Sequence, residues 1–333
     1  MPIPEAGPRV RNSVIAAVVC AGLFATPVHA EEVSGDQLVD ALNAIFGKHA
    51  KTRGSHAKGV CVKGTFTPAK EAAALSKAPF LASPVPVLGR FSFGGGSPAP
   101  NEKAKSARGL AVRFDPDGKA ATDFVMLSAP IFFARTPQEV VAFLQARAPG
   151  PDGKPDPAKV KAFGEAHPWT GKQAAWVAAR PVPASYAGLA YHSIHAFTVT
   201  SADGMAFVVK FMLEPGAGEL GLTEEEAKAK PDGFFSADLD ERLAKGPVSF
   251  SLVAIEGTSA DPVDDPTAEW PEAERRKIPL GDLAITSKEA DATCDATTFD
   301  PNNLAEGIAG QPGDKILPAR GTAYAVSLTR RSQ

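Results

Sequence analysis

Residues 52–66 have the sequence TRGSHAKGVCVKGTF. The second half of this stretch, residues 60–66, is rich in β-branched residues, which is typical of a β-strand. His56 comes just before that strand, and an imidazole can take up and release protons near neutral pH. On its own, a histidine near a lysine and a glycine is more often a turn or surface residue. Evidence for a chemical role of His56 must therefore come from the rest of the chain.

Composition indicates one large globular domain. The chain has 333 residues, of which 44% are hydrophobic and 22% charged, within the usual range for folded proteins. The net charge is -3 and no basic patch with interleaved aromatic residues occurs, so we expect no nucleic-acid partner.

The N-terminus has the features of a signal peptide. Arg9 and Arg11 precede an apolar run, residues 14–25, and small residues lead up to Ala30. We predict that residues 1–30 are a signal peptide cleaved after Ala30, and that the core domain, residues 31–333, is periplasmic or secreted. The apolar run is shorter than the roughly 20 residues that a spanning helix needs, so we expect no stable membrane anchor.

Two cysteines remain after this cleavage, Cys61 and Cys294. An oxidising compartment allows them to pair, and we predict a disulfide between them. The alternative is that Cys61 stays a buried free thiol in its strand.

Periodicity predicts a helix followed by many short strands. Ser34 and Gln37 form a capping-box pattern at the start of a helix that continues to Gly47. The remaining predicted elements are strands at 60–66, 87–93, 109–114, 122–127, 191–200, 205–213 and 248–256, and helices at 137–147, 173–179, 222–228 and 237–245.

Five motifs, the first of them within the stretch quoted above, occur in one order along the chain: Arg53 to Gly59, Arg90 to Ser92, Pro130 to Arg135, Phe299 to Leu304, and Ala319 to Tyr324. In this order they resemble the haem catalases, from about His56 to Arg331. The resemblance implies an α+β fold, an antiparallel eight-stranded β-barrel with flanking helices and heme b, with its iron, at the barrel edge. The arms of large catalases have no counterpart here. The chain is therefore most similar to the small exported catalase-related peroxidases, and we expect a monomer or small homo-oligomer.

The resemblance also implies roles for individual residues. His56 would stand over one face of the haem as acid and base, with Ser92 fixing its ring, and Tyr324 would bind the iron from the other face. Six further residues would hold the cofactor: Arg53, Arg90, Arg320, Arg331, Phe132 and Phe133. We assign structural roles to His192 and His195, because residues three apart in a strand face opposite sides.

Residue 127 departs from the family pattern. Catalases have an asparagine three residues before the proline of the Pro130 motif, where this chain has Leu127. We therefore expect an apolar pocket that favours organic hydroperoxides, with weak catalase activity on hydrogen peroxide. The electron donor would be a small molecule or a protein.

Three alternatives remain open. They are a haem-binding or haem-storage protein, a haem enzyme that rearranges lipid hydroperoxides, and a barrel that binds an apolar ligand without catalysis. A haem peroxidase is preferred because it accounts for the histidine, the arginines and the tyrosine together.

Overall fold

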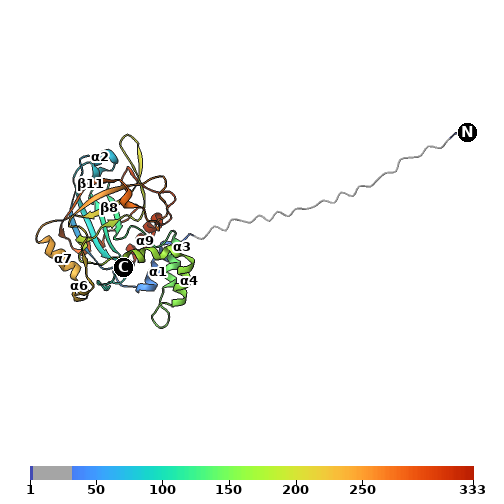
Figure 1. Cartoon of the computed structure of the whole chain (residues 1–333), viewed down its shortest axis with the longest axis horizontal. Coiled ribbons are helices and arrows are strands. Elements are labelled where there is room, and N and C mark those ends of the chain that lie inside the picture. Colours follow the sequence, from blue (N-terminus) through green and yellow to red (C-terminus); the bar gives the residue numbers. More distant parts are fainter. Residues whose placement is uncertain (3–31) are drawn as a thin grey trace. The chain divides into compact units, whose positions relative to one another are not determined.

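Eight antiparallel strands close into a barrel in the computed structural model, which describes residues 1–2 and 32–333. All elements named below lie in one unit, Val33–Gln333 (Figure 1). The predicted signal peptide lies outside the described residues apart from Met1 and Pro2, so its cleavage stays a prediction. Within residues 1–2 and 32–333, no helix combines the length and the apolar character needed to cross a bilayer.

The barrel strands follow the order β10-β11-β1-β2-β3-β4-β6-β8, and pairing of β8 with β10 closes the ring. Their bounds are β1 (Gly59–Pro68), β2 (Val85–Phe93), β3 (Arg108–Phe114), β4 (Thr122–Leu127), β6 (Tyr191–His192), β8 (Ala206–Pro215), β10 (Val248–Glu256) and β11 (Lys277–Lys288). Two short strands extend the sheet, β7 (Phe197–Thr200) and β12 (Ile308–Gly310), and β5 (Val182–Pro183) pairs with β9 (Gly221–Leu222).

Aromatic rings fill the interior of the barrel. Phe124 and Phe211 stack with their ring centroids 4.4 Å apart, and the rings of Phe80 and Phe114 are 4.5 Å apart. The alternation of β2 sends Phe91 into this core, whereas Arg90 and Ser92 face a cavity outside the barrel wall. Arg90 and Ser92 therefore share one face of the strand.

Strand β11 is the barrel strand that sequence periodicity missed. Pro279 cannot donate a backbone hydrogen bond, which argues against a central strand. The strand accommodates it at an irregularity, where the register against β10 shifts between Leu252, opposite Gly281, and Val253, opposite Pro279. The bulge therefore lets a proline-containing segment complete the barrel.

The predicted strand 191–200 is wrong as one continuous element, because β6 and β7 are separated by residues 193–196. The Ser193 hydroxyl accepts from Phe211 N at 2.9 Å and donates to His195 O at 2.9 Å. These local bonds replace part of the strand ladder, and they change which side His195 faces.

Helices pack outside the barrel. The longer ones are α1 (Gly35–Phe46), α3 (Pro137–Ala146), α4 (Pro157–Ala166), α7 (Phe234–Leu243) and α9 (Ile316–Arg331), and the shorter ones are α2 (Ala72–Leu75), α5 (Lys172–Ala178), α6 (Glu224–Ala229) and α8 (Asp291–Asp295). Four single 3-10 turns complete the list: Pro79–Leu81, Pro168–Gly171, Tyr186–Gly188 and Glu272–Glu274.

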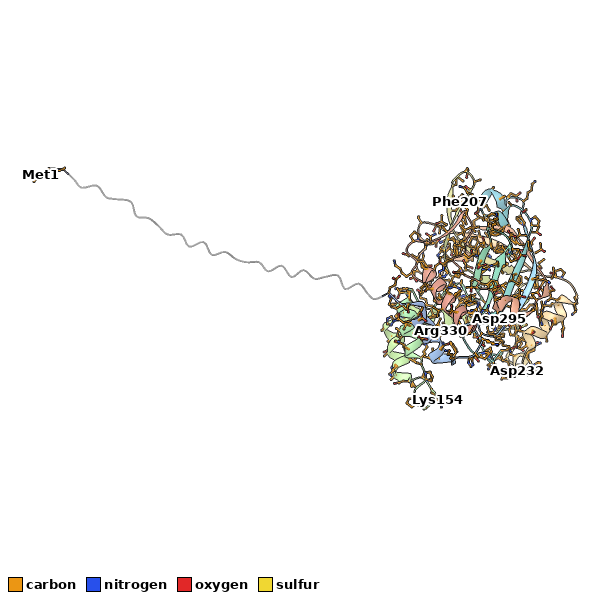
Figure 2. All side chains as sticks on the ribbon, turned by 180° about the vertical axis from the view of Figure 1, so that it is seen from behind. Met1, Lys154, Phe207, Asp232, Asp295 and Arg330 are labelled. Carbon is orange, nitrogen blue, oxygen red and sulfur yellow. A yellow bond between two sulfur atoms is a disulfide. The ribbon has the colours of Figure 1, made fainter. Side chains whose placement is uncertain are left out.

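The first and last helices lie against each other. The predicted capping box starts α1, with Ser34 accepting from Gln37 N. Gly35 approaches α9 so closely that a Cβ there would lie 2.6 Å from Thr322 O. Helices α1 and α3 also pack together, on the side of the barrel away from α6 and α7 (Figure 1). Phe207 of β8 and Lys154, just before α4, lie at opposite ends of this unit (Figure 2).

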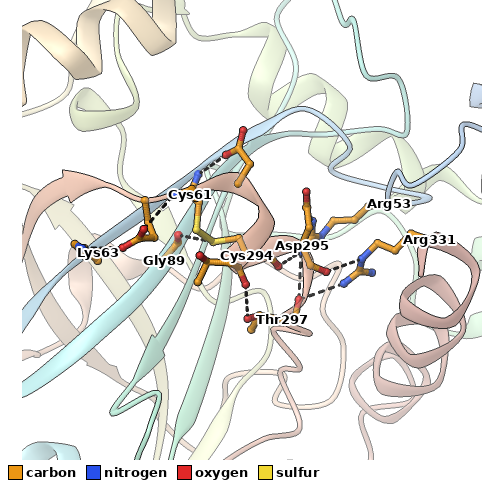
Figure 3. Close-up of a disulfide and its surroundings, with 12 residues drawn as sticks. Arg53, Cys61, Lys63, Gly89, Cys294, Asp295, Thr297 and Arg331 are labelled. Carbon is orange, nitrogen blue, oxygen red and sulfur yellow. Dashed lines mark hydrogen bonds and ion pairs between the residues drawn. A yellow bond between two sulfur atoms is a disulfide. The ribbon is translucent and has the colours of Figure 1, made fainter. Parts of the chain in front are cut away.

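The predicted disulfide between Cys61 and Cys294 is present, with Cα atoms 5.7 Å apart. It joins β1 to α8 across 233 positions in sequence (Figure 3). Both cysteines are fully buried, beside Leu88 and Phe299.

Candidate functional site

A cavity of about 310 Å³ lies between the outer face of β2, β3 and β4 and the helices α1, α3 and α9. This volume is within the range of small-molecule sites, roughly 300–1,000 Å³. The nine residues that the sequence predicts for the site all line this cavity: Arg53, His56, Arg90, Ser92, Phe132, Phe133, Arg320, Tyr324 and Arg331. The barrel therefore brings together motifs that are up to 278 positions apart in the chain, from Arg53 to Arg331.

His56 has an unusual backbone conformation with a defined hydrogen-bond partner. Its φ angle is 55°, in the left-handed region that non-glycine residues rarely adopt. Its Nδ1 atom lies 2.9 Å from Ser92 Oγ. The hydroxyl therefore fixes the ring and leaves Nε2 as the nitrogen available to a substrate.

Two glycines make room for this arrangement. A Cβ at Gly59 would lie 2.6 Å from the guanidinium carbon of Arg90. A Cβ at Gly109 would lie 2.8 Å from Ser92 Oγ and 2.9 Å from His56 Nδ1. Gly109 lies in the predicted strand 109–114, in which the sequence predicts no site residue. Only the folded structure shows that Gly109 contacts the site.

His56 is held in its neutral form. Burial, together with the guanidinium charges of three arginines, lowers the pKa of this imidazole from 6.5 to about 3. At neutral pH the ring therefore carries a lone pair and can act as a base.

Three arginines at one end of the cavity leave positive charge uncompensated. Arg90 donates to His56 O at 2.8 Å and to Ala57 O at 2.9 Å. Arg331 likewise donates to backbone carbonyls, and Arg53 pairs with Asp295. In the described part of the chain, Asp295 is the one carboxylate paired with this group, so a net charge of about +2 remains, which an anion can neutralise.

At the other end of the cavity, Tyr324 belongs to a chain of polar side chains. Arg320 donates to the Tyr324 hydroxyl from Nη2 at 2.8 Å and from Nε at 3.2 Å. Arg320 Nη1 lies 2.9 Å from His195 Nε2, and His195 Nδ1 lies 2.5 Å from Asp314 Oδ2. Two donors on one phenol oxygen suit an anionic oxygen.

The partners of His195 determine its protonation. Arginine only donates, so Nε2 must accept, and Nδ1–H must then donate to Asp314. Burial lowers the pKa of His195 to about 4 despite the opposing effect of Asp314, which agrees with a neutral ring. The assignment of a purely structural role to His195 was therefore incomplete, because the interrupted strand turns it toward Arg320.

Asp314 was also missed, although its position carries a recognisable pattern. Its Oδ1 accepts from Ile316 N at 2.8 Å and from Leu317 N at 3.1 Å, at the start of α9. An aspartate two residues before an apolar helical run is a typical cap, but the sequence does not indicate that its other oxygen holds His195.

The remaining wall is apolar. Leu127 lies on β4 opposite Gly109, and Phe132 and Phe133 have ring centroids 4.2 Å apart. Gln173 of α5 also lines the cavity and donates to Ile131 O at 2.8 Å, and the sequence does not predict its place there.

Apolar walls, two uncompensated guanidinium charges, an imidazole and a phenol together fit a flat apolar ring that bears two carboxylates and a metal ion.

Comparison with known proteins gives the same family from sequence and from structure. The Catalase family model matches residues 33–332. A catalase-related peroxidase from Synechococcus elongatus is 34% identical over 321 residues, covering 95% of this chain and 94% of that protein. A catalase-related peroxidase from Mycolicibacterium paratuberculosis is 35% identical over 304 residues, covering 89% of this chain and 94% of that protein.

Among solved structures, the chain is similar to catalase A from Saccharomyces cerevisiae, with a TM-score of 0.75 and 21% identity. The match covers 88% of this chain and 64% of that one. At this identity the likeness supports the fold alone.

Proposed function

Since the chain belongs to the catalase family, whose members bind haem and act on peroxide, we propose that it is a peroxidase that binds heme b and reduces organic hydroperoxides. The observation that carries the proposal is the position of His56 and Tyr324 in one cavity. When bound, the haem would supply the iron and the electrons for breaking the O–O bond.

His56 is proposed as the acid and base. With Nδ1–H donating to Ser92, Nε2 would remove the proton from one peroxide oxygen and return it to the other oxygen as the bond breaks. The depressed pKa of His56 is consistent with this role, because the ring is unprotonated at neutral pH and its lone pair is free.

Tyr324 is proposed as the iron ligand on the opposite face. Its support is the pair of hydrogen bonds that Arg320 donates to the phenol oxygen. Arg53, Arg90 and Arg331 are proposed to neutralise the two propionates, and Phe132 and Phe133 to pack against the ring.

Organic hydroperoxides are the proposed substrates because Leu127 offers no hydrogen bond in this wall. A small hydrated peroxide gains little from an apolar wall, whereas an alkyl group gains by leaving water.

We also propose export. The support is the apolar segment before Ala30 together with the Cys61–Cys294 disulfide, because disulfides persist in oxidising compartments. The mass of the mature protein tests this proposal: a chain beginning at Glu31 is expected, and a mature chain that keeps Met1 contradicts it.

The decisive experiment compares Tyr324→Phe with His56→Ala in the haem-loaded protein. We expect Tyr324→Phe to lose the parent ferric spectrum, and His56→Ala to keep that spectrum while losing about 100-fold or more in turnover of an organic hydroperoxide. A Tyr324→Phe variant with the parent spectrum and full activity contradicts the ligand assignment. A parent protein that binds haem without any turnover favours haem storage.

A further inference from the structure

One short segment orients two of the cavity arginines. Arg53 Nη2 donates to Cys294 O at 2.6 Å and to Thr297 O at 3.2 Å. Arg331 donates to Asp295 O from Nε and to Thr297 O from Nη2, both at 3.2 Å. Figure 3 shows the two side chains, one from the loop before β1 and one from the end of α9, meeting at residues 294–297.

This segment has little stability of its own. Helix α8, Asp291–Asp295, has five residues and no side-chain cap at its N-terminus, and helices this short are not stable in isolation. Its position must therefore depend on bonds to its surroundings. Cys61 supplies two of them: its N–H donates to Asp291 Oδ1 at 3.2 Å, and its carbonyl accepts from Glu289 N at 2.9 Å.

The disulfide is the covalent tie between the same two places. Its position is specific, because Cys294 carries both the sulfur bonded to β1 and the carbonyl that accepts from Arg53. The carbonyl is therefore only a few bonds from the point where the segment is anchored.

The arginines need such an anchor because they repel each other. Both donate to Thr297 O, so their charges lie close together, and burial together with Arg53 lowers the pKa of Arg331 to about 10. The paired carboxylate, Asp295, is about half exposed at 47%, so its attraction is partly screened by water. Fixed carbonyl oxygens hold the two guanidinium groups in place against this repulsion.

We propose that the Cys61–Cys294 disulfide is a positioning element of the cofactor site, which holds Arg53 and Arg331 where they meet the cofactor's carboxylates. This inference rests on the proposed haem function. It makes retention of the cofactor depend on a bond that lies outside the cavity.

The test measures haem loss from the full mature chain to an excess of a haem-scavenging apoprotein. The variant is Cys61→Ala with Cys294→Ala, which keeps the buried surroundings apolar. We expect haem loss to be roughly tenfold to a hundredfold faster, the range for weakening a charge-assisted hydrogen bond. Asp291→Ala, which removes one of the two hydrogen bonds to Cys61 of β1, is expected to give a smaller change in the same direction. Haem loss at the parent rate in both variants overturns the proposal.

Two controls separate positioning from general destabilisation. Arg330→Gln removes the neighbouring cation, which pairs with Asp36 and Asp40 of α1 instead, and should leave haem loss near the parent rate. Leu239→Ala makes a hole in the fully buried surface of α7, away from the cavity lining. If this variant speeds haem loss as much as the cysteine variant does, global stability explains the effect and the proposal is wrong.

A double-mutant cycle gives the sharpest criterion. If the disulfide acts through the arginines, removing it should have little further effect in an Arg53→Gln/Arg331→Gln background. Equal effects in both backgrounds overturn the inference.

Amide exchange of the cofactor-free protein tests the segment without haem. We expect exchange of residues 291–299 to speed up by a larger factor in the cysteine variant than exchange of the barrel strands, whose rates follow the global stability. An equal factor in both regions contradicts the inference. If the parent protein binds no haem but the two proteins still differ in exchange, the proposed function is wrong. The anchoring of residues 291–299 by the disulfide then still stands.

Discussion

At the scale of single residues, the site depends on side chains whose partners allow one protonation state. Asp314 and Arg320 together require a neutral His195. Burial keeps His56 neutral as well, and the Ser92 hydroxyl can accept from its Nδ1–H, which is the tautomer that the proposed proton transfer needs. Leu127 adds no polar group, so the proposed proton transfer at the barrel side of the cavity depends on His56.

Substrate preference should respond to residue 127. We expect Leu127→Asn to raise oxygen release from hydrogen peroxide about threefold to tenfold, because one added hydrogen bond is worth roughly 0.5–1.5 kcal/mol. Turnover of an alkyl hydroperoxide should fall in the same variant. Oxygen release is measured with an electrode, and Leu127→Met serves as the apolar control. Parent rates with both substrates would show that this side chain does not select the peroxide.

The stability of the cofactor-free protein should fall in acid because of His195. Its pKa is about 4 in the folded protein and 6.5 as the ordinary value, so between these pH values the unfolded chain binds a proton that the folded chain does not. The stabilisation is complete above pH 6.5 and is lost as pH falls toward 4, by about 3 kcal/mol at most. Urea unfolding at pH 7, 5.5 and 4.5 measures it. His195→Gln should make the pH dependence shallower but not flat, because the pKa of His56 is also lowered, to about 3, and His56 contributes over the same pH range. An equally steep dependence in this variant would assign it to other groups.

At the scale of elements, the start of α9 and the gap between β6 and β7 act together. Asp314 caps α9 with one oxygen and accepts from His195 with the other. The gap in the strand brings His195 to that carboxylate. The helix carrying Tyr324 is thereby tied to the barrel wall through the buried hydrogen bond between Asp314 and His195.

We expect Asp314→Asn to destabilise the protein by about 1–3 kcal/mol. An amide has one acceptor oxygen, so its NH₂ group must face either the helix N–H groups or His195 Nδ1–H, and one donor is left unpaired. Asp156→Asn is the matched control, because Asp156 caps the exposed start of α4 and asparagine caps equally well. Denaturant unfolding compares the two variants, and equal midpoints would contradict the buried double role.

The close packing of β3 against the loop that carries His56 gives another prediction. In Gly109→Ala the new Cβ must displace Ser92 Oγ or His56 Nδ1, and a shift of about 1 Å can lower turnover roughly 100-fold. The matched control is Gly164→Ala in α4, where a Cβ meets nothing within 4 Å and alanine favours the helix. Peroxidase turnover and the haem spectrum are measured for both. Full turnover in Gly109→Ala would show that the wall tolerates the extra atom.

At the scale of the whole molecule, contacts between distant segments hold the barrel and the site together. The first described helix packs on the last one, and one disulfide spans 233 positions. Closing so long a loop restricts the unfolded chain strongly.

Removing both cysteines should lower the free energy of unfolding by up to about 5 kcal/mol in the ideal loop-entropy model. Denaturant midpoints of the parent and Cys61→Ala/Cys294→Ala measure the loss. Thiol labelling of the denatured, unreduced parent should find no reactive thiol in the mature chain. Two reactive thiols, or an unchanged midpoint, would contradict the prediction.

The sequence alone predicted the features that depend on neighbours in the chain. Most strands and the capping box of α1 follow from local periodicity and capping chemistry, which act over a few residues. The nine predicted site residues came from the resemblance of short motifs in this chain to those of the haem catalases. All nine line one cavity.

Only the tertiary structure decided the features that depend on distant partners. Pro279 lies within a barrel strand because a bulge opposite β10 accommodates it, and His195 joins the site because Ser193 replaces part of the ladder. Asp314, Gly109 and Gln173 gain their roles from groups far away in sequence. No local pattern encodes these contacts, because the energy of a buried hydrogen bond or a close approach exists only after the barrel has brought both partners together.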